Sequence, residues 1–353
     1  MELHLNTFGS FLKKKDNMFE VLVGETKTRI APEKLSSIVI SNAVTITSDA
    51  IQLAMDYNID VVFLDKYGNP YARVWFPKIG STVLIRRRQL ETLFDEQGVT
   101  FIKQWIALKI MHQHRFLKLL ISKREYARDD CSAQLFQLVD YAAEIMQSEG
   151  DLADLSGSFM GWEGSASKLY FKILSELIPD EYRFAGRSSR PARDAFNAFL
   201  NYGYGILYSK VERALIIAGL DPYIGLLHTD NYNKKSFVFD FIEPYRHFVD
   251  EPVFYIFSRH KFSPDFLETV HQGVVLSTEG KKFFGPLLLE YLDTVVRYHN
   301  KNRKLLECIQ TDAHAYANYL IGRRDAYLDA SQETKLTNFL ASNGLDQEDT
   351  RED

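Results

Sequence analysis

The chain contains little cysteine: Cys131 and Cys308 are the only two among its 353 residues. Two thiols are too few for the disulfide framework of a secreted protein or for a thiolate metal site. The first residues lack the basic start and apolar stretch of a signal peptide, and no apolar run approaches the length that crosses a bilayer. No internal repeat is visible. These absences favour a protein of the reducing cytoplasm that does not enter the membrane.

The chain does contain apolar and aromatic residues for packed cores, since 46% of its residues are hydrophobic and 13% are aromatic. This composition excludes an intrinsically disordered protein. A length of 353 residues exceeds one average domain, so we expect two domains. The formal charge of −5, from 47 acidic and 42 basic side chains, argues as a total against a nucleic-acid ligand.

The distribution of charge matters more than the total, because affinity for phosphates depends on local clusters. The segment from Ser81 to Leu120 carries seven bases against three acids. A second basic group precedes a predicted helix and contains Arg187, Arg190 and Arg193. The last eight residues are mostly acidic and offset part of this positive charge in the total.

The first eighty residues show the pattern of short strands. Phe19–Val23 is a run of apolar and β-branched residues that predicts a strand. Ile59–Leu64, a turn cluster and Tyr71–Phe76 together predict a hairpin. Residues 77–80 have the composition of a linker. The sequence therefore predicts a small β-rich N-terminal domain over residues 1–80.

After residue 80 the apolar residues recur every three or four positions, which predicts helices. Leu84–Leu120 is expected to form one long helix or a broken pair, and Arg193–Leu220 has the clearest start and stop signals. Further helices are expected over residues 135–146, 158–177, 237–257 and 286–328. We therefore predict an α+β protein in which the small β-rich domain is followed by a larger all-helical domain, 81–335, and an acidic, disordered tail, 336–353.

Glu163 lies in the segment Gly-Trp-Glu-Gly-Ser-Ala, at what we expect to be the start of a helix. A glutamate early in a helix is most often a solvated residue that the helix dipole favours. The small neighbours also permit close approach of a backbone, an ion or a phosphate. This segment alone leaves both interpretations open.

Three further polar residues occur beside apolar ones. His228 ends an apolar segment and precedes a polar loop, where a histidine is more often structural than a ligand. Asp240 and Glu243 are three apart in a helical pattern and share a face, so they need a cation or basic partners. Arg246 could be that partner, and a metal ion is the alternative. One imidazole with carboxylates suits Mg²⁺ or Mn²⁺, which favours phosphodiester chemistry.

Five segments occur in an order that resembles a known family, the CRISPR-associated integrase of spacer acquisition that is often called Cas-one. The resemblance covers nearly the whole chain. Each segment alone is weak evidence for the resemblance, but the five segments in this order are specific for the family. The segments are G-W-E-G-S-A at 161–166, R-P-A-R-D-A-F-N-A-F-L-N-Y-G-Y-G-I-L-Y at 190–208, G-L-L-H at 225–228, S-F-V-F-D-F-I-E-P-Y-R at 236–246 and G-V-V-L-S-T-E-G-K at 273–281.

By position, the resemblance places the family's catalytic metal ligands on Glu163, His228 and Glu243, with Mg²⁺ or Mn²⁺ as the cofactor. Asp240 matches an acidic position that supports the site. Tyr208 matches a tyrosine near the active site, although a buried core aromatic is the alternative. The candidate phosphate contacts, each of which could equally be a solvated surface residue, are Arg86, Arg87, Arg88, Arg190, Arg193, Lys281 and Lys282.

The resemblance implies a CRISPR adaptation integrase, a metal-dependent DNA endonuclease and transesterase in which a DNA 3′-hydroxyl attacks a phosphate beside a bound cation. It also implies a homodimer formed largely through the β-rich domain. The implied partners are spacer-precursor DNA, repeat and leader DNA, and a small second adaptation protein that bridges two dimers. A stand-alone nuclease for branched DNA and a non-catalytic DNA-binding scaffold are the alternatives.

Overall fold

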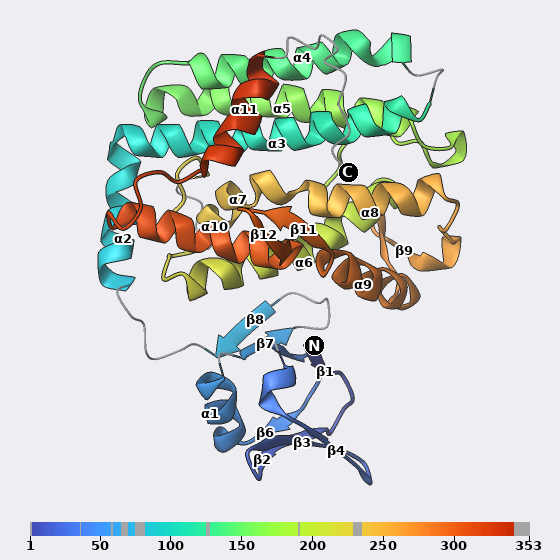
Figure 1. The fold of residues 1–353 in the computed structure, drawn as a ribbon. Helices are drawn as coiled ribbons and strands as arrows, with labels where there is room; N and C mark the ends of the chain where they lie inside the picture. Colours follow the sequence, from blue (N-terminus) through green and yellow to red (C-terminus); the bar gives the residue numbers. More distant parts are fainter. Residues whose placement is uncertain are drawn as a thin grey trace. The chain divides into compact units, whose positions relative to one another are not determined.

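The computed structural model describes residues 2–35, 37–57, 59–64, 70–74, 82–124, 128–189, 191–228 and 235–341. The chain divides into two compact units, Met1–Gly80 and Ser81–Asp353, at the residue where the sequence places the end of the linker. The predicted linker itself lies outside the described residues. The predicted fold class is confirmed, because a strand-rich unit precedes a mostly helical one (Figure 1).

The described residues of the N-terminal unit form two four-stranded sheets and the helix α1 (Ser48–Asp56). Its strands are β1 (Glu2–Leu5), β2 (Phe11–Lys15), β3 (Met18–Val23), β4 (Thr26–Ile30), β5 (Ser37–Ile40), β6 (Thr45–Ile46), β7 (Asp60–Leu64) and β8 (Pro70–Val74). The first sheet has the order β1-β5-β7-β8, in which β8 is antiparallel and the others are parallel. The second has the order β4-β3-β2-β6.

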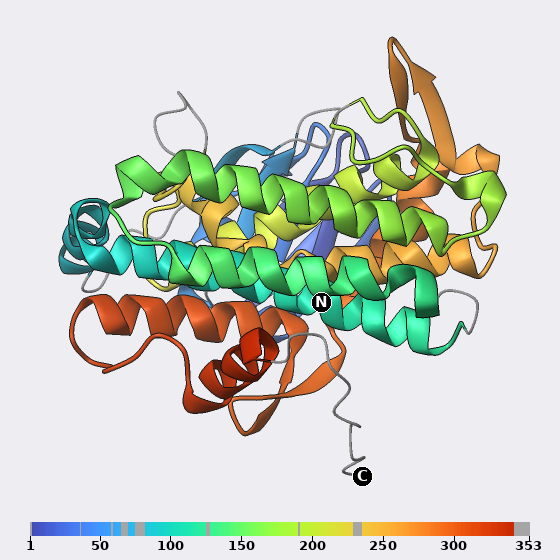
Figure 2. The same cartoon turned by 90° about the horizontal axis from the view of Figure 1, so that it is seen from above.

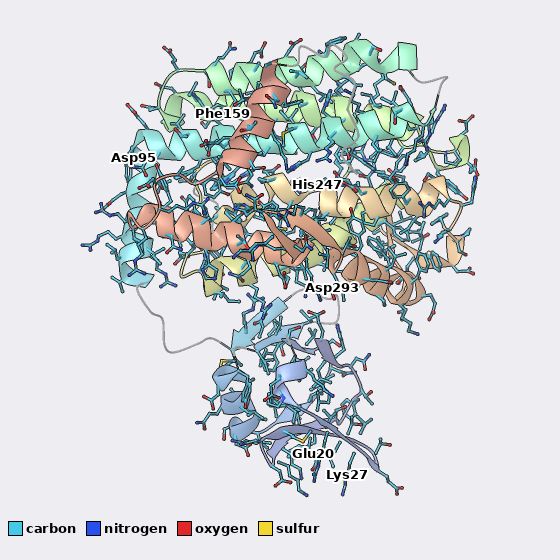
Figure 3. The ribbon with its side chains drawn as sticks, in the orientation of Figure 1. Glu20, Lys27, Asp95, Phe159, His247 and Asp293 are labelled. Atoms are coloured by element: carbon cyan, nitrogen blue, oxygen red, sulfur yellow. The ribbon has the colours of Figure 1, made fainter. Side chains whose placement is uncertain are left out.

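The hairpin of β2 and β3 shows how local sequence sets the second sheet. Its turn residues Asp16 and Asn17 have φ of 52° and 55°, which Asp and Asn tolerate better than most residues. Glu20 on β3 accepts a hydrogen bond from Arg29 Nε at 3.0 Å, and Lys27 lies on the neighbouring strand β4 (Figure 3). The core of the unit is formed by apolar side chains from both sheets and α1, which include Leu5, Leu12, Phe19, Ile38, Ile59 and Val61.

The second unit is built mainly from helices. They are α2 (Thr82–Glu91), α3 (Glu96–Ser122), α4 (Arg128–Gln147), α5 (Leu152–Glu176), α6 (Ala195–Ile217), α7 (Ser236–Phe241), α8 (His247–Ser258), α9 (Thr278–Leu292), α10 (Leu305–Leu320) and α11 (Ala330–Ala341). Short 3₁₀ turns connect several of them, including η2 (Thr92–Phe94), η4 (Asp180–Tyr182), η5 (Glu243–Tyr245) and η6 (Pro264–Phe266). Two hairpins are also present, β9 (Leu267–Val270) with β10 (Gly273–Leu276) and β11 (Val295–Tyr298) with β12 (Lys301–Lys304).

Helix α3 organises the interior of this unit. Asp95 caps it by accepting hydrogen bonds from two backbone N–H groups of the first turn, at 2.9 and 3.2 Å (Figure 3). The helix packs against α4, α5 and η5, and α3, α4 and α5 lie side by side in both ribbon views (Figures 1 and 2). Its buried face is apolar around Trp105 but also carries Lys109 and Gln113. Lys109 thereby reaches the interior between α3, α5 and η5.

Helix α6 confirms the clearest helix prediction. The Asp194 side chain accepts a hydrogen bond from Asn197 N at 2.8 Å, which fixes the start of the helix. Gly219 has φ of 87° just after the helix, the left-handed conformation that glycine adopts without strain. Of the two alternatives predicted for Leu84–Leu120, one long helix or a broken pair, the structure shows the pair, α2 and α3.

Two other predicted helices are interrupted. The segment 237–257 breaks into α7, η5 and α8 around Pro244, whose nitrogen has no hydrogen to donate. The segment 286–328 contains the β11–β12 hairpin, whose turn residues His299 and Asn300 have φ of 48° and 59° without any glycine to signal a turn. The helical unit is therefore mostly rather than entirely helical.

The C-terminal end differs in part from the sequence prediction. Helix α11 extends to Ala341 and buries Leu336 and Phe339, so residues 336–341 belong to a packed helix rather than to a tail. Residues 342–353 lie outside the described part of the chain. No helix among the described residues combines the length and apolarity needed for crossing a membrane.

Candidate active site

Glu163 lies in the middle of α5, not at a helix start as the sequence predicted, because Asp151 caps this helix twelve residues earlier in the chain by accepting a hydrogen bond from Asp154 N at 2.9 Å. The small residues Gly161 and Gly164 face open space and give no sign of a helix end. The Glu163 carboxylate accepts a hydrogen bond from Ser167 Oγ at 2.8 Å, one helical turn later. The same oxygen, Oε1, pairs with the ammonium of Lys109.

Glu243 opens the η5 turn and is 7% exposed. Its Oε1 accepts from Arg246 Nε at 2.9 Å and from Nη2 at 2.7 Å, and its Oε2 lies 2.6 Å from Lys109 Nζ. Burial would raise the pKa of Glu243, but the charges of Arg246 and Lys109 outweigh burial and lower this pKa to about 2. Glu243 is therefore ionised, and Arg246 is the basic partner that the sequence offered as one alternative.

Lys109 joins the two glutamates. Its side chain is 5% exposed, and its ammonium pairs with Glu163 from α5 and with Glu243 from η5. Burial alone would lower the pKa of Lys109, yet Glu243 and Glu163 outweigh burial and raise it. The Lys109 ammonium thus places a positive charge where the two carboxylates converge. A bound metal ion would supply positive charge at the same place.

The Asp240 carboxylate fixes the position of His228. Asp240 is 2% exposed and accepts backbone N–H groups from Leu226 at 2.6 Å, Leu227 at 3.1 Å and His228 at 3.2 Å. Its Oδ1 also lies 2.6 Å from His228 Nδ1, and this hydrogen bond raises the pKa of the imidazole. The contact at Nδ1 leaves Nε2 as the ring nitrogen for a further ligand. Asp240 is therefore a positioning residue.

One cavity of about 370 Å³ is lined by residues from six segments of the chain. Glu163, His228 and Glu243 all line it, as the sequence analysis requires. Among the other lining residues are Lys109, Gln113, Ser167, Arg187, Ser188, Ser189, Tyr204 and Arg246.

Tyr208, on α6, is not a lining residue of this cavity. Its hydroxyl accepts a hydrogen bond from Arg246 Nη1 at 3.3 Å, and the Arg246 guanidinium lies 5.8 Å from the ring centre. Tyr208 thus supports the arginine that holds Glu243.

None of the predicted phosphate contacts that the structure describes is a lining residue of the cavity. Several have acidic neighbours: Arg86 with Asp221 at 3.7 Å, Arg88 with Glu91 at 2.6 Å and Lys282 with Glu279 at 3.0 Å. Arg87 and Arg193 are exposed, and Lys281 is half-buried. Arg190 lies outside the described residues. DNA contact by these residues stays a prediction.

Sequence reasoning did not assign two of the lining cations to the site. Lys109 interrupts an apolar helix pattern, and a lysine at a core position is rare unless it is paired, so this signal was available. Arg187 stands in a basic group with Arg190 and Arg193, and the sequence gives no reason to prefer it. Only the fold distinguishes it.

The donor set suits a divalent cation, although no three described His, Cys, Asp and Glu side chains meet as a ready-made metal group. Glu163 and Glu243 already share one cation, the Lys109 ammonium. His228, on the wall of the same cavity, has the carboxylate partner that metal-bound imidazoles usually have. Two carboxylates and an imidazole match Mg²⁺ or Mn²⁺ better than a soft metal.

Comparison with known proteins gives concordant matches. The family model "CRISPR associated protein Cas1" matches residues 3–287. A CRISPR-associated endonuclease Cas1 of Archaeoglobus fulgidus is 33% identical over 337 residues, which cover 92% of this chain and 97% of that protein.

Solved structures match as well. A casposase bound to its integration product superimposes with a TM-score of 0.76 at 20% identity, covering 100% of this chain and 96% of that one. A chain of a Cas6-RT-Cas1–Cas2 complex gives a TM-score of 0.72 at 23% identity, covering 94% of this chain and 36% of that one. These structural matches show a shared fold.

Proposed function

The chain belongs to the Cas1 family of CRISPR-associated proteins, and from this premise we propose that it is a metal-dependent DNA endonuclease and integrase that joins new spacer DNA to a CRISPR repeat. The observation that carries the proposal is the cavity in which Glu163 and Glu243 share a cation beside His228. Carboxylates this deeply paired with cations are costly to build, which supports a catalytic rather than a scaffold role.

Glu163, His228 and Glu243 would hold the ion. When bound, Mg²⁺ or Mn²⁺ supplies Lewis-acid chemistry, because it stabilises the charge that develops on the reacting phosphate. In strand joining, a 3′-hydroxyl oxygen forms a new bond to phosphorus, the bond from phosphorus to the leaving strand's oxygen breaks, and that oxygen takes up a proton. With water as the nucleophile, the same exchange cuts DNA.

The surrounding side chains fix the ligands before DNA arrives. Arg246 holds Glu243 through two hydrogen bonds, and Lys109 keeps the two carboxylates facing each other. Asp240 orients the His228 ring. Preorganisation of this kind lowers the barrier because the groups need not reorganise during the reaction.

The proposed partners follow from the family and from what related complexes contain. One structural relative is bound to an integration product and another belongs to a complex that includes Cas2. We therefore propose DNA as substrate and a small second adaptation protein as partner. A homodimer through the N-terminal unit is supported by β4, an edge strand with four of its five residues exposed.

The test is strand joining on a repeat-bearing plasmid with Mn²⁺ or Mg²⁺. Glu163→Ala and His228→Ala should abolish the joining of a DNA 3′ end, while DNA binding, measured by fluorescence anisotropy, survives. Full joining activity in both variants would overturn the catalytic assignment. An unmutated protein that binds DNA but never joins or cuts it with metal would instead be a scaffold.

A further inference from the structure

Arg187 is a cavity residue to which the proposed chemistry assigns no role. It lies in the loop between η4 and α6, is exposed, and lines the same cavity as Glu163 and Glu243. An exposed arginine is normally mobile. This one is held on several sides.

Neutral oxygens fix one end of the guanidinium. Nη1 donates to Ser188 O and to Asn197 Oδ1, each at 2.7 Å, and Nη2 donates to Asn201 Oδ1 at 2.8 Å. Asn197 is fully buried and is itself held by Asp194 Oδ2 at 2.7 Å and Gly186 O at 2.9 Å. The frame that carries Arg187 is therefore rigid.

Two aromatic rings make cation–π contacts with the Arg187 guanidinium. Its central carbon lies 5.2 Å from the ring centre of Tyr204 and 5.9 Å from that of Phe171. The Arg246 guanidinium lies 5.1 Å from the same Tyr204 ring. Tyr204 thus contacts both cations, Arg187 and the arginine that holds Glu243.

The charge of Arg187 differs from that of the other two cavity cations. Lys109 and Arg246 are paired with glutamates, whereas Arg187 has no carboxylate within ion-pairing distance among the described residues. Three of its five N–H groups are used, and the Nε–H and the second Nη2–H have no acceptor among those residues. A rigid guanidinium that has no ion-pair partner and has two neighbouring N–H groups left over is suited to bidentate binding of a phosphate.

We propose that Arg187 binds a non-reacting backbone phosphate of the DNA, next to the phosphate that reacts, through Nε–H and Nη2–H. This inference rests on the proposed function, since it takes DNA as the ligand. Arg187 sets the register of the strand relative to Glu163 and Glu243. Ser188 and Ser189 form the adjoining wall of this phosphate subsite.

The experiment measures DNA affinity without metal over a series of salt concentrations, for the full chain and three variants. Arg187→Gln should bind about tenfold more weakly and lower the slope of log affinity against log salt by about one, the effect of losing one phosphate contact. Arg187→Lys should restore the salt slope and part of the DNA affinity, because lysine keeps the positive charge but lacks the paired N–H donors of the guanidinium. Arg183→Gln, the control, removes an exposed arginine whose charge Asp180 neutralises at 2.9 Å, and should leave both unchanged.

Unchanged affinity and slope in Arg187→Gln would overturn the proposal. So would a lower melting temperature with an unchanged slope, since that result shows a purely structural role. Metal-dependent joining by the unmutated protein is measured separately. Its absence would count against the proposed function, and the salt series would still decide whether Arg187 contacts a phosphate.

Discussion

Two regions of the helical unit bury carboxylates in different ways. In the cavity, Glu243 is paired with the cations Lys109 and Arg246. Asp250 lies behind the cavity wall and accepts a hydrogen bond from the hydroxyl of the lining residue Tyr204. In the same manner, Asp312 on α10 accepts hydrogen bonds from the hydroxyls of Tyr245 at 2.6 Å and Tyr298 at 2.5 Å.

This difference distinguishes a binding site from contacts that only pack the helices together. The tyrosine hydroxyls donate hydrogen bonds to Asp250 and Asp312 without adding charge, and these bonds join neighbouring helices. Buried ion pairs add little to the free energy of folding, because the cost of desolvating the charges offsets most of their attraction. A cation between two carboxylates can, however, be exchanged for another cation. We therefore interpret the cavity as a binding site and the tyrosine-bonded carboxylates as packing contacts.

The largest expected effect is on activity. Glu243→Gln keeps the shape of the side chain but removes the charge that a metal needs, so metal-dependent joining should fall to background. Asp312→Asn is the matched change in the tyrosine-bonded region and should keep most of the activity of the unmutated protein. Joining rates on the same plasmid compare the two. Equal losses in both variants would remove the distinction between the regions.

The next effect concerns Lys109. Lys109→Met leaves two carboxylates facing each other, one of them buried, and should lower the free energy of unfolding by about 3–5 kcal/mol without metal. Added Mn²⁺ should then raise the melting temperature of this variant more than that of the unmutated protein, because the ion replaces the lost charge. Lys118→Met on an exposed position of the same helix is the control. A Mn²⁺ response no larger than in the unmutated protein would contradict the exchange of cations.

The two regions should also respond oppositely to pH. Burial raises the pKa of Asp250 from 3.8 to about 6, so its stabilising contribution is present below pH 3.8 and is lost as pH rises towards 6. The pKa of Glu243 falls from 4.5 to about 2, so its contribution is present above pH 4.5 and is lost as pH falls towards 2.

Denaturant unfolding between pH 4 and 7 checks this difference. Asp250→Asn should gain stability relative to the unmutated protein as pH rises, by at most about 3 kcal/mol. Glu243→Gln should be most destabilised in the upper part of this range. Parallel pH profiles for the two variants would show that the carboxylates are buried in the same way.

A smaller effect is expected for Asp240, which acts through His228. Asp240→Asn keeps an oxygen for the backbone N–H groups but loses the charge that orients the imidazole, so Mn²⁺ affinity should fall by about 10- to 100-fold. Isothermal titration calorimetry measures this directly. Unchanged affinity would mean that Asp240 serves only the loop backbone.

The sequence predicts much of this fold because the signals are local. A run of apolar and β-branched residues marks β3, and the capping residue Asp194 with Gly219 marks the ends of α6. The β11–β12 hairpin could not be predicted in this way, because His299 and Asn300 form its turn where glycine is usual. Pro244 is visible in the sequence, but whether it ends a helix or only kinks it depends on tertiary packing.

The candidate site, too, could be predicted from the sequence only in part. Motif order was enough to select Glu163, His228 and Glu243, which the fold brings to one cavity. It could not show that Lys109, 54 positions before Glu163, pairs with it, because contacts this distant in sequence depend on how α3 packs against α5. Nor could it separate Arg187 from the neighbouring arginines, since its role depends on Asn197, Asn201 and Tyr204.

The most direct measurement is a crystal structure with Mn²⁺, in which anomalous scattering locates the ion. An ion bound by Glu163, His228 and Glu243, with the Lys109 ammonium moved from between the two carboxylates, is the predicted result. An ion bound elsewhere, with Lys109 still pairing both glutamates, would contradict the assignment of these three residues as the metal ligands.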